Sequence, residues 1–342
     1  MKKFFSLFLT AALLTGILSG CGTTPSANTE QTQNKKSLHI VTTIFPEYDW
    51  VREVLGDQAD NAEITFLLDN GVDMHSYQPS AEDIMNISTC DVFVYAGGES
   101  DAWAADAVKN ATNENMQVIN LMDVLGENAK EEEVVEGMQG EHDHDHDHEY
   151  SEEHEHEDDH EEEPEYDEHV WLSLKNAQIF VSAVADSLSK ADPAHADTYS
   201  ANASAYNGKL AQLDTAYQAA VDAAPIHTVL FADRFPFRYL VDNYGLSYYA
   251  AFSGCSADTQ ASFDTIIFLT DKVNELGLHS ILTIENSDDK IANTIIQNTQ
   301  SHDQQIRVLN SMQTVTSQDI ASGTTYLSVM EENLDVLSAA LQ

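Results

Sequence analysis

The sequence is short of positive charge and of cysteine. Its 342 residues include 15 Lys and Arg against 58 Asp and Glu, and three cysteines. With a formal charge of −43, it lacks the basic clusters that phosphate binding requires. This excludes a non-specific nucleic-acid binder and a protein that docks on anionic lipid through a basic face. Three cysteines are too few for a disulfide scaffold. The length predicts about two domains.

The sequence also lacks an apolar run of the ~20 residues that a membrane-spanning helix needs. The longest, residues 4–19, follows a short basic start and is typical of a signal peptide. It leads to Leu18-Ser19-Gly20-Cys21, which is similar to a bacterial lipobox. We therefore expect a signal peptide over residues 1–21, a lipidated Cys21 and a flexible tether over residues 22–37. The body would work outside the cytoplasm, anchored to the cell membrane; an incidental cysteine in an ordinary leader is the alternative.

Strand-like and helix-like segments alternate twice along the chain. Strands are predicted at residues 38–45, 64–68, 92–96 and 118–121, and again at 228–232, 247–252, 280–284 and 306–309. Helices are predicted at residues 47–56, 80–87, 102–110, 235–244, 263–276, 289–299 and 325–341. This alternation indicates an α/β protein with two lobes, each a mostly parallel sheet flanked by helices.

One long helix is predicted between the two halves. Apolar side chains recur in alternating steps of four and three residues, which places them on one helix face; they are Tyr199, Ala203, Tyr206, Leu210, Leu213, Tyr217 and Ala220. Pro225 ends the pattern. We expect a rigid linking helix over residues 197–224 that joins an N-terminal lobe (38–196) to a C-terminal lobe (225–342) and allows little hinge bending.

A histidine-rich acidic tract interrupts the first half. Residues 127–168 hold 22 of the 58 acidic residues, and the tract contains seven of the fourteen histidines, namely His142, His144, His146, His148, His154, His156 and His160. Such a composition cannot build a core, so residues 127–166 are predicted to be a disordered loop. Imidazole and carboxylate are metal ligands, which suggests weak auxiliary metal capture. A solvated acidic linker is the alternative.

Two motifs flank this tract. Residues 71–80, GVDMHSYQPS, and residues 167–173, DEHVWLS, resemble the ligand motifs of the metal-binding solute receptors of bacterial ABC importers, the zinc and manganese receptors. The resemblance implies two α/β lobes joined by a rigid helix, with Zn²⁺ or Mn²⁺ held in the cleft. It further implies His75 and His169 as first-lobe ligands, and an ABC permease with its ATPase as partners.

The second lobe departs from the family pattern. Ala232 stands where the resemblance places a histidine, and Gln260 and Asn310 stand where acidic residues are usual. The second-lobe ligands therefore stay open. They could be residues that follow predicted strands, namely Asp233, Glu285, Cys255 and Asn310. A histidine of the tract could also complete the site. Asp233 could instead pair with Arg234, and Cys255 could be a buried thiol or form a disulfide with Cys90.

The sequence thus predicts a monomeric zinc receptor of an ABC importer, without enzymatic activity. Zinc is favoured because Mn²⁺ is the weakest binder of imidazole in the Irving–Williams order. A manganese or iron receptor of the same architecture is the nearest alternative. A metallohydrolase with an open coordination position is another, although no His-Glu-x-x-His pattern is present. A zinc buffer that uses only the histidine tract is the third.

Overall fold

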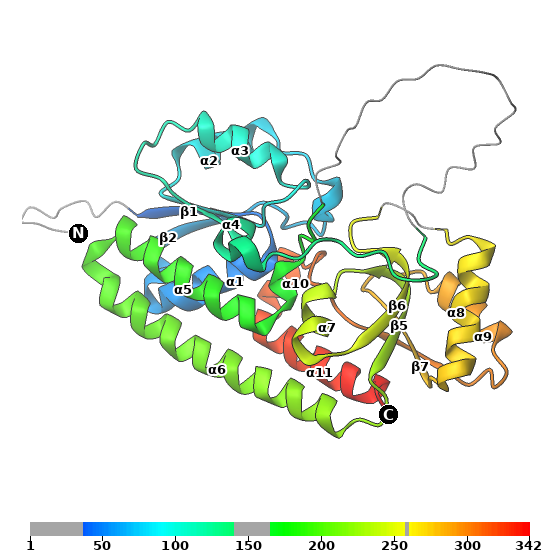
Figure 1. Cartoon of the computed structure of the whole chain (residues 1–342). Helices are drawn as coiled ribbons and strands as arrows, with labels where there is room; N and C mark the ends of the chain where they lie inside the picture. The colour runs from blue at the N-terminus through cyan, green and yellow to red at the C-terminus, as the bar shows by residue number, and fades with distance from the viewer. Residues whose placement is uncertain (1–36, 140–164, 257–259) are drawn as a thin grey trace, which may run out of the picture. The chain divides into compact units, whose positions relative to one another are not determined.

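The computed structural model describes residues 37–139, 165–256 and 260–342, and Figure 1 shows the arrangement of their helices and strands. The predicted signal peptide with Cys21, most of the tether and the seven histidines of the tract lie outside these residues. Across the described ranges, no helix combines the length and the apolar character needed to cross a bilayer.

The first lobe is built on a parallel four-stranded sheet in the order β2-β1-β3-β4. Its strands are β1 (Leu38–Thr42), β2 (Ala62–Phe66), β3 (Val92–Tyr95) and β4 (Gln117–Asn120). All four residues of β3 are buried, as expected for a parallel strand covered on both faces.

The second lobe repeats this arrangement in the order β6-β5-β7-β8, again parallel. Its strands are β5 (Thr228–Phe235), β6 (Ser247–Ser253), β7 (Ser280–Thr283) and β8 (Gln305–Val308). The pairing of β5 with β6 shifts register between Phe231 and Arg234. β5 continues three residues beyond its predicted end, so Asp233 and Arg234 lie within the strand and not after it.

Helices cover both sheets. They are α1 (Phe45–Leu55), α2 (Ala81–Thr89), α3 (Ala102–Lys109), α4 (Leu121–Leu125), α5 (Leu174–Ala191), α6 (Ala196–Ala223), α7 (Arg238–Tyr244), α8 (Phe263–Leu276), α9 (Lys290–Asn298), α10 (Ser317–Ala321) and α11 (Tyr326–Ala340). α5 is not among the predicted helices, although the Ser173 side chain caps it by accepting the backbone N–H of Asn176 at 3.1 Å.

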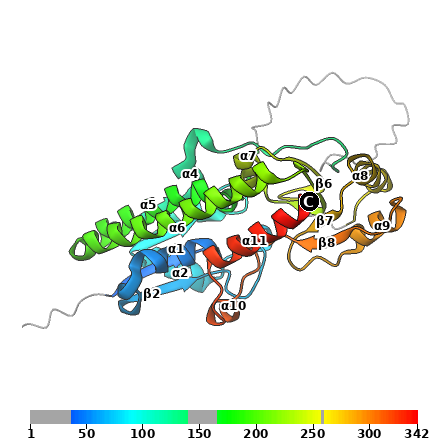
Figure 2. The ribbon, with the colours of Figure 1, turned by 90° about the horizontal axis from the view of Figure 1, so that it is seen from below.

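The linking helix is confirmed as α6, which begins one residue before its predicted start. Its predicted apolar face is buried as far as Tyr217, with Val221 in place of Ala220 in the last turn. α6 packs along α5 and α1 of the first lobe and along α7 and α11 of the second, as Figure 2 shows. The Tyr217 hydroxyl donates to the carbonyl of Met330 at 2.6 Å, which ties α6 to α11.

The prediction of disorder over residues 127–166 is wrong for residues 127–139, and residues 140–164 lie outside the described part of the chain. Residues 127–139 carry regular backbone contacts: the N–H of Glu132 donates to the carbonyl of Glu165 at 2.9 Å, and the N–H of Gln139 donates to Ala251 in β6 at 3.0 Å. Side chains contribute as well: Met138 is buried in the core, and Oε1 of Glu132 accepts the N–H of Cys255 at 3.1 Å. The acidic composition of the tract gave no sign of these contacts.

Candidate metal centre

His75 is presented by a short 3-10 turn, Met74–Ser76, in the loop that follows β2. Asp73 caps this turn, since its Oδ1 accepts the backbone N–H of His75 at 3.0 Å. The Nδ1 atom of the ring is hydrogen bonded to Oγ of Ser100 at 2.7 Å. The turn and this bond together leave Nε2 as the ring atom that faces the second motif.

His169 is completely buried and precedes a second 3-10 turn, Val170–Leu172. Oδ1 of Asp167 accepts both the backbone N–H of His169, at 2.8 Å, and its ring Nδ1, at 3.1 Å. Because a carboxylate only accepts, Nδ1 carries a proton, and Nε2 is the ring atom that can become free for a cation. A carboxylate behind the ligating imidazole is typical of metal sites.

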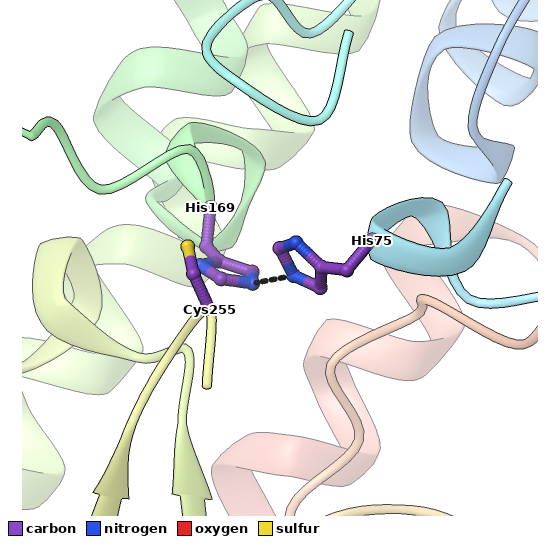
Figure 3. A group of neighbouring side chains, drawn as sticks. All are labelled: His75, His169 and Cys255. Atoms are coloured by element: carbon purple, nitrogen blue, oxygen red, sulfur yellow. Dashed lines mark hydrogen bonds between the residues drawn. The ribbon is translucent and has the colours of Figure 1, made fainter. Parts of the chain in front are cut away.

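The two imidazoles meet at their Nε2 atoms, which lie 3.2 Å apart (Figure 3). One proton is needed for a hydrogen bond at this distance, and a cation that accepts both lone pairs can take its place. Burial lowers the pKa of His75, and the charges of His169 and Arg234 lower it further. Burial acts the same way on His169, but the Asp167 carboxylate raises its pKa overall. His75 is therefore the ring held neutral.

Cys255 completes a group of three donors. Its Sγ and one nitrogen of each imidazole all lie within 4.8 Å of one another, and Figure 3 shows it just beyond the ends of two strands. The adjacent Gly254 permits this approach, because a Cβ there would lie 3.0 Å from Cε1 of His169. Burial raises the pKa of the Cys255 thiol, and the nearby carboxylate of Glu132 raises it further. The metal-free thiol is therefore protonated.

Glu168 places a buried carboxyl group behind His75. Its Oε1 accepts the backbone N–H of Ser100 at 2.8 Å. Its Oε2 has no hydrogen-bond partner among the residues described and lies 3.9 Å from Nδ1 of His75. Gly98, with φ of 81°, allows the approach, since a Cβ would lie 2.4 Å from Oε1. This carboxyl can balance the charge of a cation bound at the rings.

Gln313, which follows β8, was missed by sequence reasoning. It is 95% buried, and its Nε2 donates to Oγ of Ser311 at 3.0 Å. In the described part of the chain its Oε1 has no hydrogen-bond partner, yet the side chain interacts with His75 and favours its protonated form. An amide oxygen so placed can serve as a donor. No local pattern marks Gln313, because an isolated Gln after a strand is ordinary.

The other second-lobe candidates are engaged elsewhere. Oδ1 of Asp233 accepts the N–H of Arg234 at 2.9 Å. The two carboxylate oxygens of Glu285 each accept from Ser311 at 2.7 Å, so Glu285 shapes the turn before Gln313. Oδ1 of Asn310 accepts the N–H of Met312 at 2.8 Å. None of these three candidates belongs to the three-donor group.

Cys90 and Cys255 do not form a disulfide, and Arg234 pairs with a residue other than Asp233. Cys90 and Cys255 are free thiols, and Cys90 is buried in the first lobe, where its Sγ contacts the Ile87 carbonyl at 3.2 Å. Arg234 pairs with Asp73 at 2.7 Å. Both Asp73 and Arg234, with His75 and Cys255, line a cavity of about 570 Å³ beside the donors.

Comparison with known proteins identifies the family of this chain. The family model described as zinc-uptake complex component A, periplasmic, matches residues 40–340. The zinc-binding lipoprotein AdcA of Streptococcus pneumoniae is 32% identical over 338 residues, which are 98% of this chain and 60% of the relative. The high-affinity zinc uptake system protein ZnuA of Bacillus subtilis is 28% identical over 340 residues, 99% of this chain and 98% of the relative.

Solved structures share the fold. The Zn(II)-bound ZnuA-like domain of Streptococcus pneumoniae AdcA matches with a TM-score of 0.66 at 28% identity, covering 89% of this chain and 99% of that domain. The metal-dependent lipoprotein YcdH of Bacillus subtilis matches with a TM-score of 0.69 at 25% identity, covering 90% and 100%. The predicted two-lobed α/β fold is confirmed, although the chain spans only 60% of the full AdcA protein. Since the family model covers most of its length, this chain belongs to the family of zinc-uptake complex component A, periplasmic.

Proposed function

We propose that this protein is an extracytoplasmic receptor that captures Zn²⁺ between its two lobes and presents it to an ABC importer. The observation that carries the proposal is the pair of Nε2 atoms of His75 and His169, 3.2 Å apart, with the Sγ of Cys255 within 4.8 Å of one nitrogen of each ring. An uptake component binds its cargo and hands it on without chemistry, so the metallohydrolase alternative is set aside.

The spacing of the donors supports zinc. With Zn–N bonds of about 2.0–2.1 Å and tetrahedral angles, two ligating nitrogens lie roughly 3.3 Å apart. The observed 3.2 Å therefore needs almost no rearrangement of the rings. The Sγ of Cys255 lies within 4.8 Å of one nitrogen of each imidazole, and it must move toward the ion to reach a Zn–S bond of about 2.3 Å.

The fourth donor in this proposal is the amide oxygen of Gln313. Four ligands close a zinc site that must hold its ion without reacting with water. Like Glu168 on the Nδ1 side of the ring, Gln313 is a buried side chain that interacts with His75 and has an oxygen without a partner among the described residues. Binding would satisfy this oxygen, which otherwise carries the cost of an unpaired buried acceptor.

The donor set favours zinc over manganese. Two imidazoles and a thiolate are borderline and soft ligands, whereas Mn²⁺ prefers oxygen ligands in an octahedral arrangement. The ion must also displace the thiol proton of Cys255, which a strong thiolate binder such as Zn²⁺ does more readily. The buried carboxyl groups of Asp167 and Glu168 offset the charge of the complex.

The cellular setting follows from the leader and the family. Lipidation of Cys21 would anchor a monomeric receptor to the cell membrane of a bacterium, close to a permease and its ATPase. The named relatives include a zinc-binding lipoprotein and a zinc uptake protein, which supports this setting. The histidines between residues 142 and 160 would collect zinc loosely, with Mn²⁺ as the alternative cargo of the main site.

Competition titration against a chromophoric chelator tests the proposal. We expect one tight Zn²⁺ per chain and much weaker Mn²⁺ binding. His75→Ala, His169→Ala and Cys255→Ser should each weaken zinc binding by more than the roughly 10- to 100-fold that loss of an outer-shell partner costs. His302→Ala, at an exposed position, and Cys90→Ala serve as matched controls.

Two results would overturn the proposal. Zinc affinity unchanged in either histidine variant would show that the ion binds elsewhere. Loss of tight one-to-one binding on deletion of residues 141–163 would favour the zinc-buffer alternative. Substitution of Co²⁺ for zinc reports separately on Cys255, since a thiolate-to-metal charge-transfer band should be present in the wild type and absent in Cys255→Ser.

A further inference from the structure

An ion pair connects the His75 loop to the sheet of the second lobe. Nη2 of Arg234 lies 2.7 Å from Oδ2 of Asp73. The two side chains are only 21% and 19% exposed, so the pair is shielded from solvent more than a surface salt bridge. Arg234 belongs to β5 and lies at the register shift of that strand, an irregularity of the kind that redirects a side chain.

The Asp73 carboxylate has a second partner. While Oδ2 binds the guanidinium, Oδ1 accepts the backbone N–H of His75 at 3.0 Å. One carboxylate therefore joins a second-lobe cation to the main chain of a first-lobe metal ligand. A displacement of Asp73 would move the turn that carries His75.

The loop that carries His75 is also held at its start, near Asp69 and Asn70. Asn70 forms an isolated bridge with Thr316, and the N–H of Ser317 donates to the carbonyl of Asp69 at 2.8 Å. These contacts fix the start of the loop, whereas the Arg234–Asp73 pair acts two residues from the ligand. The Arg234–Asp73 pair can therefore set the orientation of His75.

We propose that Arg234 is a positioning residue: through Asp73 it holds His75 in ligating contact with His169 before the metal arrives. This inference rests on the proposed zinc site. A site whose donors are already in place binds more tightly, because the ordering of the loop does not oppose binding. The Arg234–Asp73 pair supplies that order from the opposite lobe.

The charge of Arg234 has an opposite effect on zinc binding, so the direction of the affinity change in Arg234→Gln distinguishes the two roles. A guanidinium repels a dication, and the charge of Arg234 is felt at both His75 and His169. If Arg234 acted only through its charge, Arg234→Gln would tighten zinc binding. If it positions His75, the same substitution weakens binding.

The experiment measures zinc affinity by chelator competition in the whole chain. We expect Arg234→Gln and Asp73→Asn each to weaken binding about 10- to 100-fold, as for loss of an outer-shell partner. Asn can still accept the His75 N–H, so Asp73→Asn removes the ion pair and not the cap. Arg234→Lys should restore most of the affinity. Arg307→Gln removes the same charge from β8 and should have no effect.

A double-variant cycle separates positioning from general destabilisation. If Arg234 acts through His75, Arg234→Gln has no further effect on zinc affinity in the His75→Ala background. The intense visible bands of tetrahedral Co²⁺ should weaken in Arg234→Gln toward those of His75→Ala. Thermal unfolding of the metal-free variants checks the fold, and Asp73→Asn carries the test if Arg234→Gln does not fold.

The outcomes are distinct from those that test the zinc site itself. A wild type without a single tight site ends the proposed function. A wild type that binds zinc tightly, with Arg234→Gln binding equally or more tightly, overturns the positioning role alone. An additive loss in the His75→Ala background would overturn it as well.

Discussion

Oδ1 of Asp167 accepts both the ring Nδ1 and the backbone N–H of His169, at 3.1 and 2.8 Å. Two bonds from one atom fix the tautomer and the orientation of a fully buried imidazole. The Nε2 atom is therefore directed at His75 without any contribution from the metal. This arrangement raises the basicity of the ring, which strengthens its bond to a cation.

Asp167→Ala should weaken zinc binding about 10- to 100-fold, the usual cost of losing the carboxylate behind a ligating histidine. Asp167→Asn should cost less, because its amide oxygen can still accept both bonds and keep the tautomer. Chelator competition measures both, with the exposed Asp186→Asn as the control on the surface of α5. Equal affinities for wild type and Asp167→Ala would contradict the role of Asp167.

Gly254→Ala should weaken zinc binding while leaving the fold intact. The new Cβ would lie 3.0 Å from both Cε1 of His169 and the carbonyl oxygen of Phe235, so the imidazole has to move by a few tenths of an ångström. Gly208→Ala in α6 is the matched control, since its Cβ meets no atom within 4 Å and should stabilise the helix by roughly 0.5–1 kcal/mol. Titration and thermal unfolding together check both; wild-type affinity in Gly254→Ala would refute the crowding argument.

Stability of the metal-free protein should fall as the pH rises from about 5 to about 8. Burial, and then the charge of Asp101, raises the pKa of Glu47 to about 8 from 4.5, and burial raises the pKa of Asp101 to about 7. Across this range the folded state holds protons that the unfolded chain has released. The free energy of unfolding then decreases with pH, by up to ~1.4 kcal/mol per unit for each group.

Glu47→Gln should flatten this pH dependence, because the amide stays neutral. Its oxygen can still accept the N–H of Thr43, which Glu47 accepts at 2.8 Å. Urea unfolding at three pH values between 5 and 8 measures the effect, with the exposed Glu82→Gln as control. The same slope in Glu47→Gln as in the wild type would show that Glu47 does not titrate in this range.

The division into two lobes could be predicted because it depends on local periodicity. Alternating strand and helix signals placed all eight strands, and the three–four spacing of apolar residues located α6 to within one residue of its start. α5 was not predicted, although Ser173 provides its N-cap. Residues 127–139 were predicted to be disordered from their acidic composition, but composition carries no information on backbone hydrogen bonds to distant segments.

For the proposed site, the sequence alone pointed to His75 and His169 through their motifs, in which Asp73 and Asp167 cap or orient them locally. Only the tertiary structure decided the partners from the second lobe. Cys255, which follows β6 of the second lobe, lies beside the two first-lobe histidines. Asp233, Glu285 and Asn310 lie outside this group and accept hydrogen bonds from Arg234, Ser311 and Met312. Which side chain is left free to bind an ion depends on all of its neighbours at once, and those neighbours are set by packing between lobes and not by adjacency in the sequence.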